Sequence, residues 1–151
     1  MTLCEYFNSQ FSMLQNLDFL ARILAACFCG GCIGFERTKR FKEAGIRTHV
    51  IVCCAAALLM IVSKYGFADL TALDGANFHG TRGADPARVA AQVVSGISFL
   101  GAGVIFKNGS AVKGLTTAAG IWATAGIGLA LGSGMYFIGF AVTVLIAVFQ
   151  I

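Results

Sequence analysis

The stretch GISFLGAGVIFKNGSAVKGLTTAAG, residues 96–120, decides the fold. It consists of an apolar run, a short basic interruption, and a second apolar run rich in Gly, Ala and Thr. In water, a glycine inside a helix costs about 1 kcal/mol relative to alanine. A lipid bilayer offsets this cost, because small residues let membrane helices approach closely. The stretch therefore predicts two closely packed membrane helices joined by a basic turn at 107–113.

The composition of the whole chain points the same way. Its 151 residues are 58% hydrophobic and 12% charged, whereas an ordinary soluble domain has about 25% charged residues. A chain this short has a large surface for its volume and needs polar residues to cover it in water. The composition therefore predicts an integral membrane protein with a single domain.

Apolar runs divide the chain into candidate spans. A helix needs about 20 residues to cross a hydrocarbon core about 30 Å thick. An N-terminal segment at 1–14 lacks the basic start of a cleavable signal peptide. The predicted spans after it are 15–35, 46–65, 87–106, 114–131 and 134–151. The fold class predicted for 15–151 is an all-α, multi-pass bundle of five transmembrane helices.

The connections between these spans differ in charge. The connection 36–47 is rich in Arg and Lys, and 107–113 contains two lysines, whereas 66–86 contains three aspartates and one arginine. An excess of Lys and Arg marks the cytoplasmic side. The pattern predicts that the N-terminus is outside and the C-terminus is cytoplasmic.

Small residues recur at helical spacing. Two GxxxG pairs occur, in the first and fourth spans, and further glycines lie in the third span. Such faces predict tight packing of the first, third and fourth helices. The predicted packing residues are Gly30, Gly34, Gly96, Gly101, Gly103, Gly128 and Gly132.

Polar residues gather where three helix ends are expected to meet at the cytoplasmic side. One reading is a positive-inside anchor with helix caps, and the other is a functional inner site. An acid among bases suggests an ion pair of Glu36 with Arg47 or Arg37. The candidate cluster is Glu36, Arg37, Arg47, His49, Thr116 and Thr117.

A second polar group is expected at the outer side. Asp85, Arg88 and Gln92 follow one another at helical spacing at the start of the third span. They form either a capped helix start with an interfacial arginine or a polar niche that opens outward. In the first span, Arg22 either pairs with Asp18, four residues earlier, or extends to the headgroups.

The sequence offers little for metal or catalytic chemistry. Cys29-x-x-Cys32 has no His, Asp or Glu ligand nearby, so we interpret these cysteines as small packing residues. Asp69, Asp74 and Asp85 with His79 form either a weak site for hydrated Mg²⁺ or a plain solvated loop. No nucleophile elbow, P-loop or paired carboxylates occur. We therefore predict no enzyme activity, no metal site and no cofactor beyond this possible Mg²⁺.

Three motifs resemble the MgtC/SapB family of bacterial inner-membrane proteins. They are G-x-ER followed by AG-x-RTH, then D-x-x-R-x-AAQ-x-x-x-GI-x-FLGAG, then V-x-GLTTAA-x-x-W. The resemblance covers about residues 20–140, and Ser98 departs from the usual glycine. It implies five membrane helices and a link to magnesium homeostasis, to acid or low-magnesium stress and to virulence. Some members add a cytoplasmic ACT-like domain, which we expect to be either absent here or removed from the sequence.

Two functions remain open. The first is a regulator that acts on other membrane complexes, such as the ATP synthase, through helix contacts. The second is a transporter or channel for Mg²⁺ or another small solute. Regulation is favoured because the charge expected in mid-membrane, Arg22, would repel Mg²⁺. The expected partners are the lipid bilayer and a second copy in a homo-oligomer, a dimer, with no nucleic acid.

Overall fold

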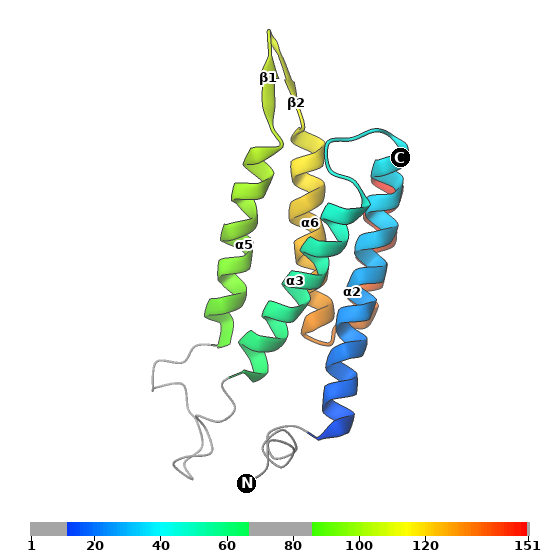
Figure 1. Cartoon of the computed structure of the whole chain (residues 1–151), viewed down its shortest axis with the longest axis vertical. Coiled ribbons are helices and arrows are strands. Elements are labelled where there is room, and N and C mark those ends of the chain that lie inside the picture. The colour runs from blue at the N-terminus through cyan, green and yellow to red at the C-terminus, as the bar shows by residue number, and fades with distance from the viewer. Residues whose placement is uncertain (1–11, 67–85, 151) are drawn as a thin grey trace.

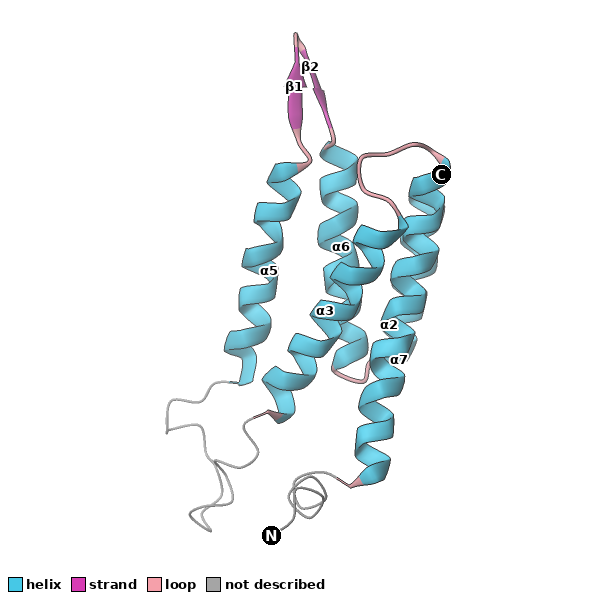
Figure 2. Ribbon diagram, in the orientation of Figure 1, coloured by secondary structure: helices cyan, strands magenta, loops and turns pink. Residues whose placement is uncertain are grey.

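The computed structural model describes residues 12–66 and 86–150 (Figure 1). Five helices lie in this part of the chain, and their directions alternate along the bundle. They are α2 (Met13–Lys39), α3 (Ile46–Tyr65), α5 (Pro86–Gly103), α6 (Leu115–Gly132) and α7 (Tyr136–Phe149). A short hairpin, β1 (Phe106–Asn108) and β2 (Ala111–Lys113), stands beyond one end of the bundle (Figure 2). We call this the hairpin end, and the other the opposite end.

Local sequence signals explain where the helices begin. The Ser12 hydroxyl accepts a hydrogen bond from the Gln15 amide, and the Gln15 side chain accepts one from the Ser12 amide. This capping box fixes the start of α2. Helix α5 begins at Pro86, since proline suits a first helical turn. The expected cap Asp85 lies outside the described residues.

The connection after α5 differs from the prediction. Helix α5 ends at Gly103 rather than continuing to 106, and residues 106–113 form an antiparallel hairpin instead of a simple turn. Phe106 pairs with Lys113 and Lys107 with Val112. Gly109 has a φ of +64°, which the tight turn requires. The Asn108-Gly109 pair, flanked by alternating residues, indicates a hairpin. We expected only a simple turn there.

Three helices are long and apolar enough to cross a membrane: α2, α3 and α6. Helix α7 is apolar but has only 14 residues. Large aromatic side chains cover the outside, and Phe99, Phe137 and Phe149 are 83%, 84% and 86% exposed. Such a surface suits lipid rather than water. The five-span count and the orientation stay predictions.

Helix α6 lies at the centre of the bundle and packs against all four other helices. Its sequence, LTTAAGIWATAGIGLALG, is dominated by small residues, so neighbours can approach it from every side. Ile121, Ile127 and Leu131 fill the spaces between helices and are almost fully buried. Helix α5 flanks α3 and α6, and α7 flanks α2 and α6.

Both GxxxG pairs face α3, a helix that the packing prediction left out. A methyl group at Gly30 would lie 2.6 Å from the His49 carbonyl oxygen, and one at Gly34 would lie 2.5 Å from the Ile46 Cα. On the other side, a methyl group at Gly132 would lie 2.5 Å from the Ala57 carbonyl oxygen. Gly128 likewise faces the Cys53 carbonyl. Helix α3 is therefore held by backbone contact between α2 and α6.

The glycines of α5 behave differently from this prediction. Gly101 is buried, and a methyl group there would lie at an ordinary 3.7 Å from the Ala118 side chain. A methyl group at Gly96 or Gly103 would meet no atom within 4 Å among the residues described. Among the described residues, there is room for a methyl group at both positions.

Two glycines of α6, two positions apart, test the role of close contact. We expect Gly128→Ala to destabilise the bundle by about 1–3 kcal/mol, because the new methyl group collides with backbone of α3. Gly126→Ala is the matched control, since a methyl group there would meet no described atom within 4 Å. Equilibrium unfolding in mixed detergent micelles measures both variants. Equal stability of the two would contradict the backbone contact.

Candidate functional site

Polar side chains from three helices and one loop meet inside the hairpin end. Arg37 of α2, His49 of α3, and Thr117 and Thr124 of α6 are 0–2% exposed. Glu43, in the loop between α2 and α3, joins them from the surface. We call these five residues the hairpin-end cluster. Ionisable groups buried in a membrane helix bundle are rare and are functional-site candidates by default.

His49 and Thr124 form a buried pair with a defined proton arrangement. The Thr124 hydroxyl donates its one proton to the Gly120 carbonyl oxygen, at 2.8 Å. Its oxygen therefore accepts from His49 Nδ1, 2.9 Å away, which places the proton of a neutral imidazole on Nδ1. Nε2 then carries a lone pair, and it has no partner among the described residues. His49 thus presents an unused acceptor inside the bundle.

Glu43 connects the loop to α6. Its carboxylate accepts a hydrogen bond from the Thr117 hydroxyl, at 2.6 Å. This bond, its own backbone amide and, more distantly, Lys42 and Arg37 hold the pKa of Glu43 below its ordinary value. The loop carrying this charge is thereby attached to the first turn of α6.

Arg37 is the most unusual member of the cluster. It is 1% exposed, and its Nε and Nη2 atoms have no hydrogen-bond partner in the described part of the chain. The expected ion pair of Glu36 with Arg37 or Arg47 does not form. Glu36 pairs instead with Arg40, one helical turn further along α2. The reason is that α2 continues through Lys39, which places Glu36 and Arg40 on the same face.

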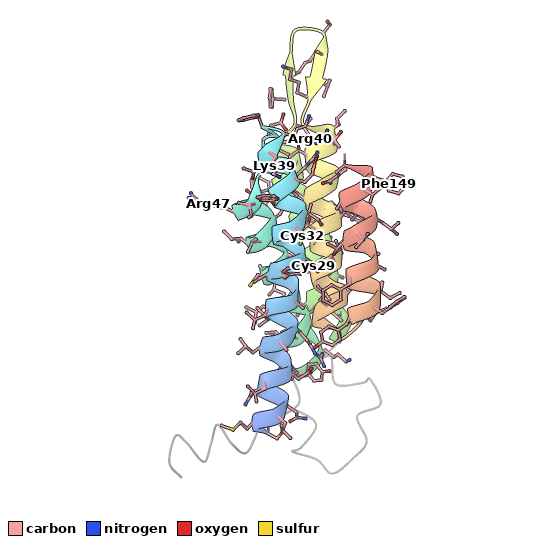
Figure 3. All side chains as sticks on the ribbon, turned by 90° about the vertical axis from the view of Figure 1, so that its right-hand side faces the viewer. Cys29, Cys32, Lys39, Arg40, Arg47 and Phe149 are labelled. Atoms are coloured by element: carbon pink, nitrogen blue, oxygen red, sulfur yellow. The ribbon has the colours of Figure 1, made fainter. Side chains whose placement is uncertain are left out.

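The remaining predicted residues of this group lie at its margins. Arg47 is exposed and points away from the bundle (Figure 3). Thr116 is exposed and lines a cavity of about 260 Å³ with Gly120 and Gln150. Of the six residues predicted for the cytoplasmic cluster, Arg37, His49 and Thr117 are brought together in the buried interior.

The predicted outer cluster is not assembled within the described residues. Arg88 and Gln92 are both exposed on α5, and Asp85 lies outside the described part of the chain. Gln92 lines a groove between α3 and α5 instead. The acidic loop residues Asp69 and Asp74, and His79, also fall outside the described residues.

A different polar network occupies the opposite end. Arg22 forms an ion pair with Asp18, at 2.5 Å, which confirms the pairing alternative. Its Nη1 also donates to the Gly132 carbonyl oxygen at 3.0 Å and to the Tyr65 hydroxyl at 3.3 Å. The Tyr136 hydroxyl donates to Asp18 at 3.1 Å. Arg22 thus satisfies a carbonyl at the end of α6 and, with Asp18, joins α2 to the ends of three other helices, which is a structural role.

Two of the described cysteines behave as packing residues. Cys29 and Cys53 are fully buried in the apolar core, while Cys32 is exposed, and all are free thiols. Figure 3 shows Cys29 and Cys32 along the middle of α2. The described residues contain no group of three or more His, Cys, Asp or Glu side chains that would hold a metal ion.

Comparison with known proteins assigns this arrangement to a family. The family model described as "MgtC family" matches residues 23–151. The chain belongs to the MgtC family. No solved structure matches this MgtC-family chain.

Several curated relatives are similar over most of the chain. "Putative magnesium transporter YhiD" of Escherichia coli (strain K12) is 50% identical over 125 residues, covering 83% of this chain and 55% of the relative. "Protein MgtC" of Brucella abortus (strain 2308) is 43% identical, covering 80% and 45%. "Protein MgtC" of Salmonella typhimurium (strain 14028s / SGSC 2262) is 40% identical, covering 85% and 49%. The chain thus spans about half the length of these relatives.

Sequence reasoning missed two members of the cluster in this MgtC-family chain. Thr124 lies 75 residues from His49 and in the middle of an apolar helix, so nothing local predicts their contact. Glu43 was missed because it lies in a connection rich in Arg and Lys. The available signal was the spacing of two threonines. Thr124 follows Thr117 by seven residues, or about two helical turns, and lies on the same face of α6.

A threonine substitution tests the His49 pair. We expect Thr124→Val to destabilise the protein by about 1–3 kcal/mol, because it leaves the buried Nδ1–H of His49 without an acceptor. Thr143→Val is the matched control, since the Thr143 hydroxyl also donates to the carbonyl four residues earlier, at 2.7 Å. Equal losses in detergent unfolding would show that the histidine contact contributes nothing.

The Glu43 carboxylate provides a pH test. Its lowered folded-state pKa stabilises the protein above the unfolded pKa, and this contribution disappears as pH falls through the folded value. Thr117→Val removes the largest cause, so we expect the pKa of Glu43 to rise toward its ordinary value. A ¹³C NMR titration of labelled glutamate measures it, with Thr116→Val as control. An unchanged titration in Thr117→Val would refute the contact.

Proposed function

We propose that the chain is a multi-pass protein of the bacterial inner membrane, crossing it five times and acting on other membrane proteins through helix contacts. Three helices long and apolar enough to span a membrane support the first part. Helix α7, about 21 Å long, and α5, with Arg88 and Gln92 near its start, would complete the bundle beside them.

Charge supports the orientation in this proposal. The hairpin end carries seven basic residues, whereas the described part of the opposite end carries Arg22, Lys64 and Arg88. The basic residues at the hairpin end are Arg37, Lys39, Arg40, Lys42, Arg47, Lys107 and Lys113. By the positive-inside rule, the hairpin end and the C-terminus face the cytoplasm, and the N-terminus faces outward.

The observation that carries the regulatory function is the uncovered face of α5. A methyl group at Gly96 or Gly103 would meet no described atom within 4 Å, unlike one at the glycines that hold α3. Beside them, a groove of about 380 Å³ runs between α3 and α5, lined by apolar side chains and by Gln92. A small-residue face next to an apolar groove suits a partner transmembrane helix. Gln92 would add one hydrogen bond to the partner helix at a fixed position in the groove.

The partner in this proposal is a helix of another membrane complex, of the kind that the family resemblance implies, such as the ATP synthase. A homodimer through α5 is the competing arrangement. The link to magnesium homeostasis rests on the family and on the name of the E. coli relative. The link to stress adaptation and virulence rests on the family resemblance alone. None of the relatives reported above has an enzyme's name.

Transport of Mg²⁺ or another small solute is the second candidate, favoured by the printed name of the E. coli relative. A Mg²⁺ path needs oxygen ligands, above all carboxylates. The charge buried inside the described bundle is the guanidinium of Arg37, which repels cations. Flux of Mg²⁺ and of protons into proteoliposomes, measured separately, decides between the two. Robust Mg²⁺ uptake by the purified chain would reject the regulatory proposal.

A substitution at the uncovered face tests the regulatory function. We expect Gly96→Leu to accumulate as folded protein, because a β-carbon there meets no described atom within 4 Å, yet to fail to complement a deletion strain at low Mg²⁺. Gly126→Leu, at an equally open position on α6, is the matched control and should complement. Full complementation by Gly96→Leu would show that α5 is not the working surface. Molecular mass in detergent, with and without Gly96→Leu, separates the homodimer from another partner.

A further inference from the structure

Arg37 is a buried charge without a counter-ion. Its side chain lies in the last turn of α2, 1% exposed, and Nε and Nη2 lack partners in the part of the chain that the structure describes. An unpaired guanidinium removed from water is strongly destabilising. Something therefore neutralises it when the protein is in its working state.

The nearby carboxylates do not satisfy Arg37. Glu36 pairs with Arg40, and Glu43 is bonded to Thr117. The charge of Arg37 reaches Glu43 only as a distant contribution. The guanidinium therefore remains available to an outside anion.

The two unpartnered donors of Arg37 define the shape of that anion. Nε–H and Nη2–H lie on the same edge of the guanidinium and point in parallel. This fork matches two oxygens of a phosphate or carboxylate group.

His49 adds a condition on the ligand. Its Nε2 is a buried acceptor without a partner among the described residues, and His49 lies within electrostatic range of Arg37. Two donors and one acceptor together suit an oxyanion that carries a proton. A hydrogen phosphate group has this chemistry, with two P–O oxygens for the fork and a P–OH for the imidazole. A lipid phosphodiester and sulfate lack that proton.

An anion would enter past the loop 40–45. This loop folds back onto the end of α2, where the Lys42 amide donates to the Arg37 carbonyl at 3.2 Å and the Ile46 amide to the Thr38 hydroxyl at 2.9 Å. Phe41 is 97% exposed and has a φ of +52°, a strained conformation for an aromatic residue. A strained loop opens at lower cost. The exposed Lys39, Arg40, Lys42 and Arg47 at this end attract anions to it.

We propose that the hairpin-end cluster is a binding site for a protonated phosphate group, held by the fork of Arg37 and by Nε2 of His49. This site goes beyond the proposed function, because it needs neither the α5 face nor a protein partner. It would couple the bundle to the phosphate or phosphomonoester level on the side where the hairpin stands.

Binding of inorganic phosphate to the purified full chain in detergent tests the site. At constant ionic strength, we expect saturable binding in an equilibrium assay with ³²P-phosphate. Arg37→Lys keeps the charge but loses the fork, so affinity should fall about tenfold or more. Arg47→Lys, exposed at the same end, is the matched control and should bind normally (Figure 3).

A second variant guards against a folding defect in Arg37→Lys. Glu43→Gln removes the negative charge beside the site and should raise phosphate affinity. Sulfate should compete weakly, because it offers His49 no proton. Absent phosphate binding, or equal binding by wild type, Arg37→Lys and Glu43→Gln, would overturn the proposal. Displacement of phosphate by a short-chain phosphatidylglycerol with equal affinity would overturn the assignment to a protonated phosphate.

Discussion

Backbone contact holds α3 in place, and the rest of the bundle depends on it. Four glycines, two on α2 and two on α6, let the neighbouring helices touch α3 without intervening side chains. In a bilayer the hydrophobic effect does not drive helices together, because lipid tails are as apolar as the side chains. Close van der Waals packing between helices therefore favours their association. The two GxxxG pairs therefore largely determine which helices pack against each other.

This contact also determines where polar chemistry is buried. Gly30 meets the carbonyl of His49, so the position that lets α2 approach α3 also brings the imidazole inside. One turn further along α3, Cys53 contacts both Gly30 and Gly128. The same approach buries Arg37 next to this helix pair. Helix α5 lies outside this contact, and a methyl group at its Gly96 or Gly103 would meet no described atom within 4 Å.

Sequence alone predicted the helices well, because apolar length and charged connections are local signals. The pairing of helices was harder. Gly30, Gly34, Gly128 and Gly132 were recognised as packing residues, but a GxxxG pattern does not name its partner, and α3 has no such pattern. Arg37, His49 and Thr117 were predicted as one group because three helix ends had to meet. Thr124 and the Glu36–Arg40 pair depended on helix rotation and length, which the sequence leaves open.

Disulfide cross-linking of native cysteines tests the α2–α3 contact most directly. The thiols of Cys27 on α2 and Cys54 on α3 lie within hydrogen-bonding reach. In a variant that keeps only these two cysteines, mild oxidation in membranes should join them within one chain, as mass spectrometry of the linking peptides would show. A variant keeping Cys32, which is exposed, and Cys54 is the control and should react slowly. Equal rates for the two pairs would contradict the packing described for α3.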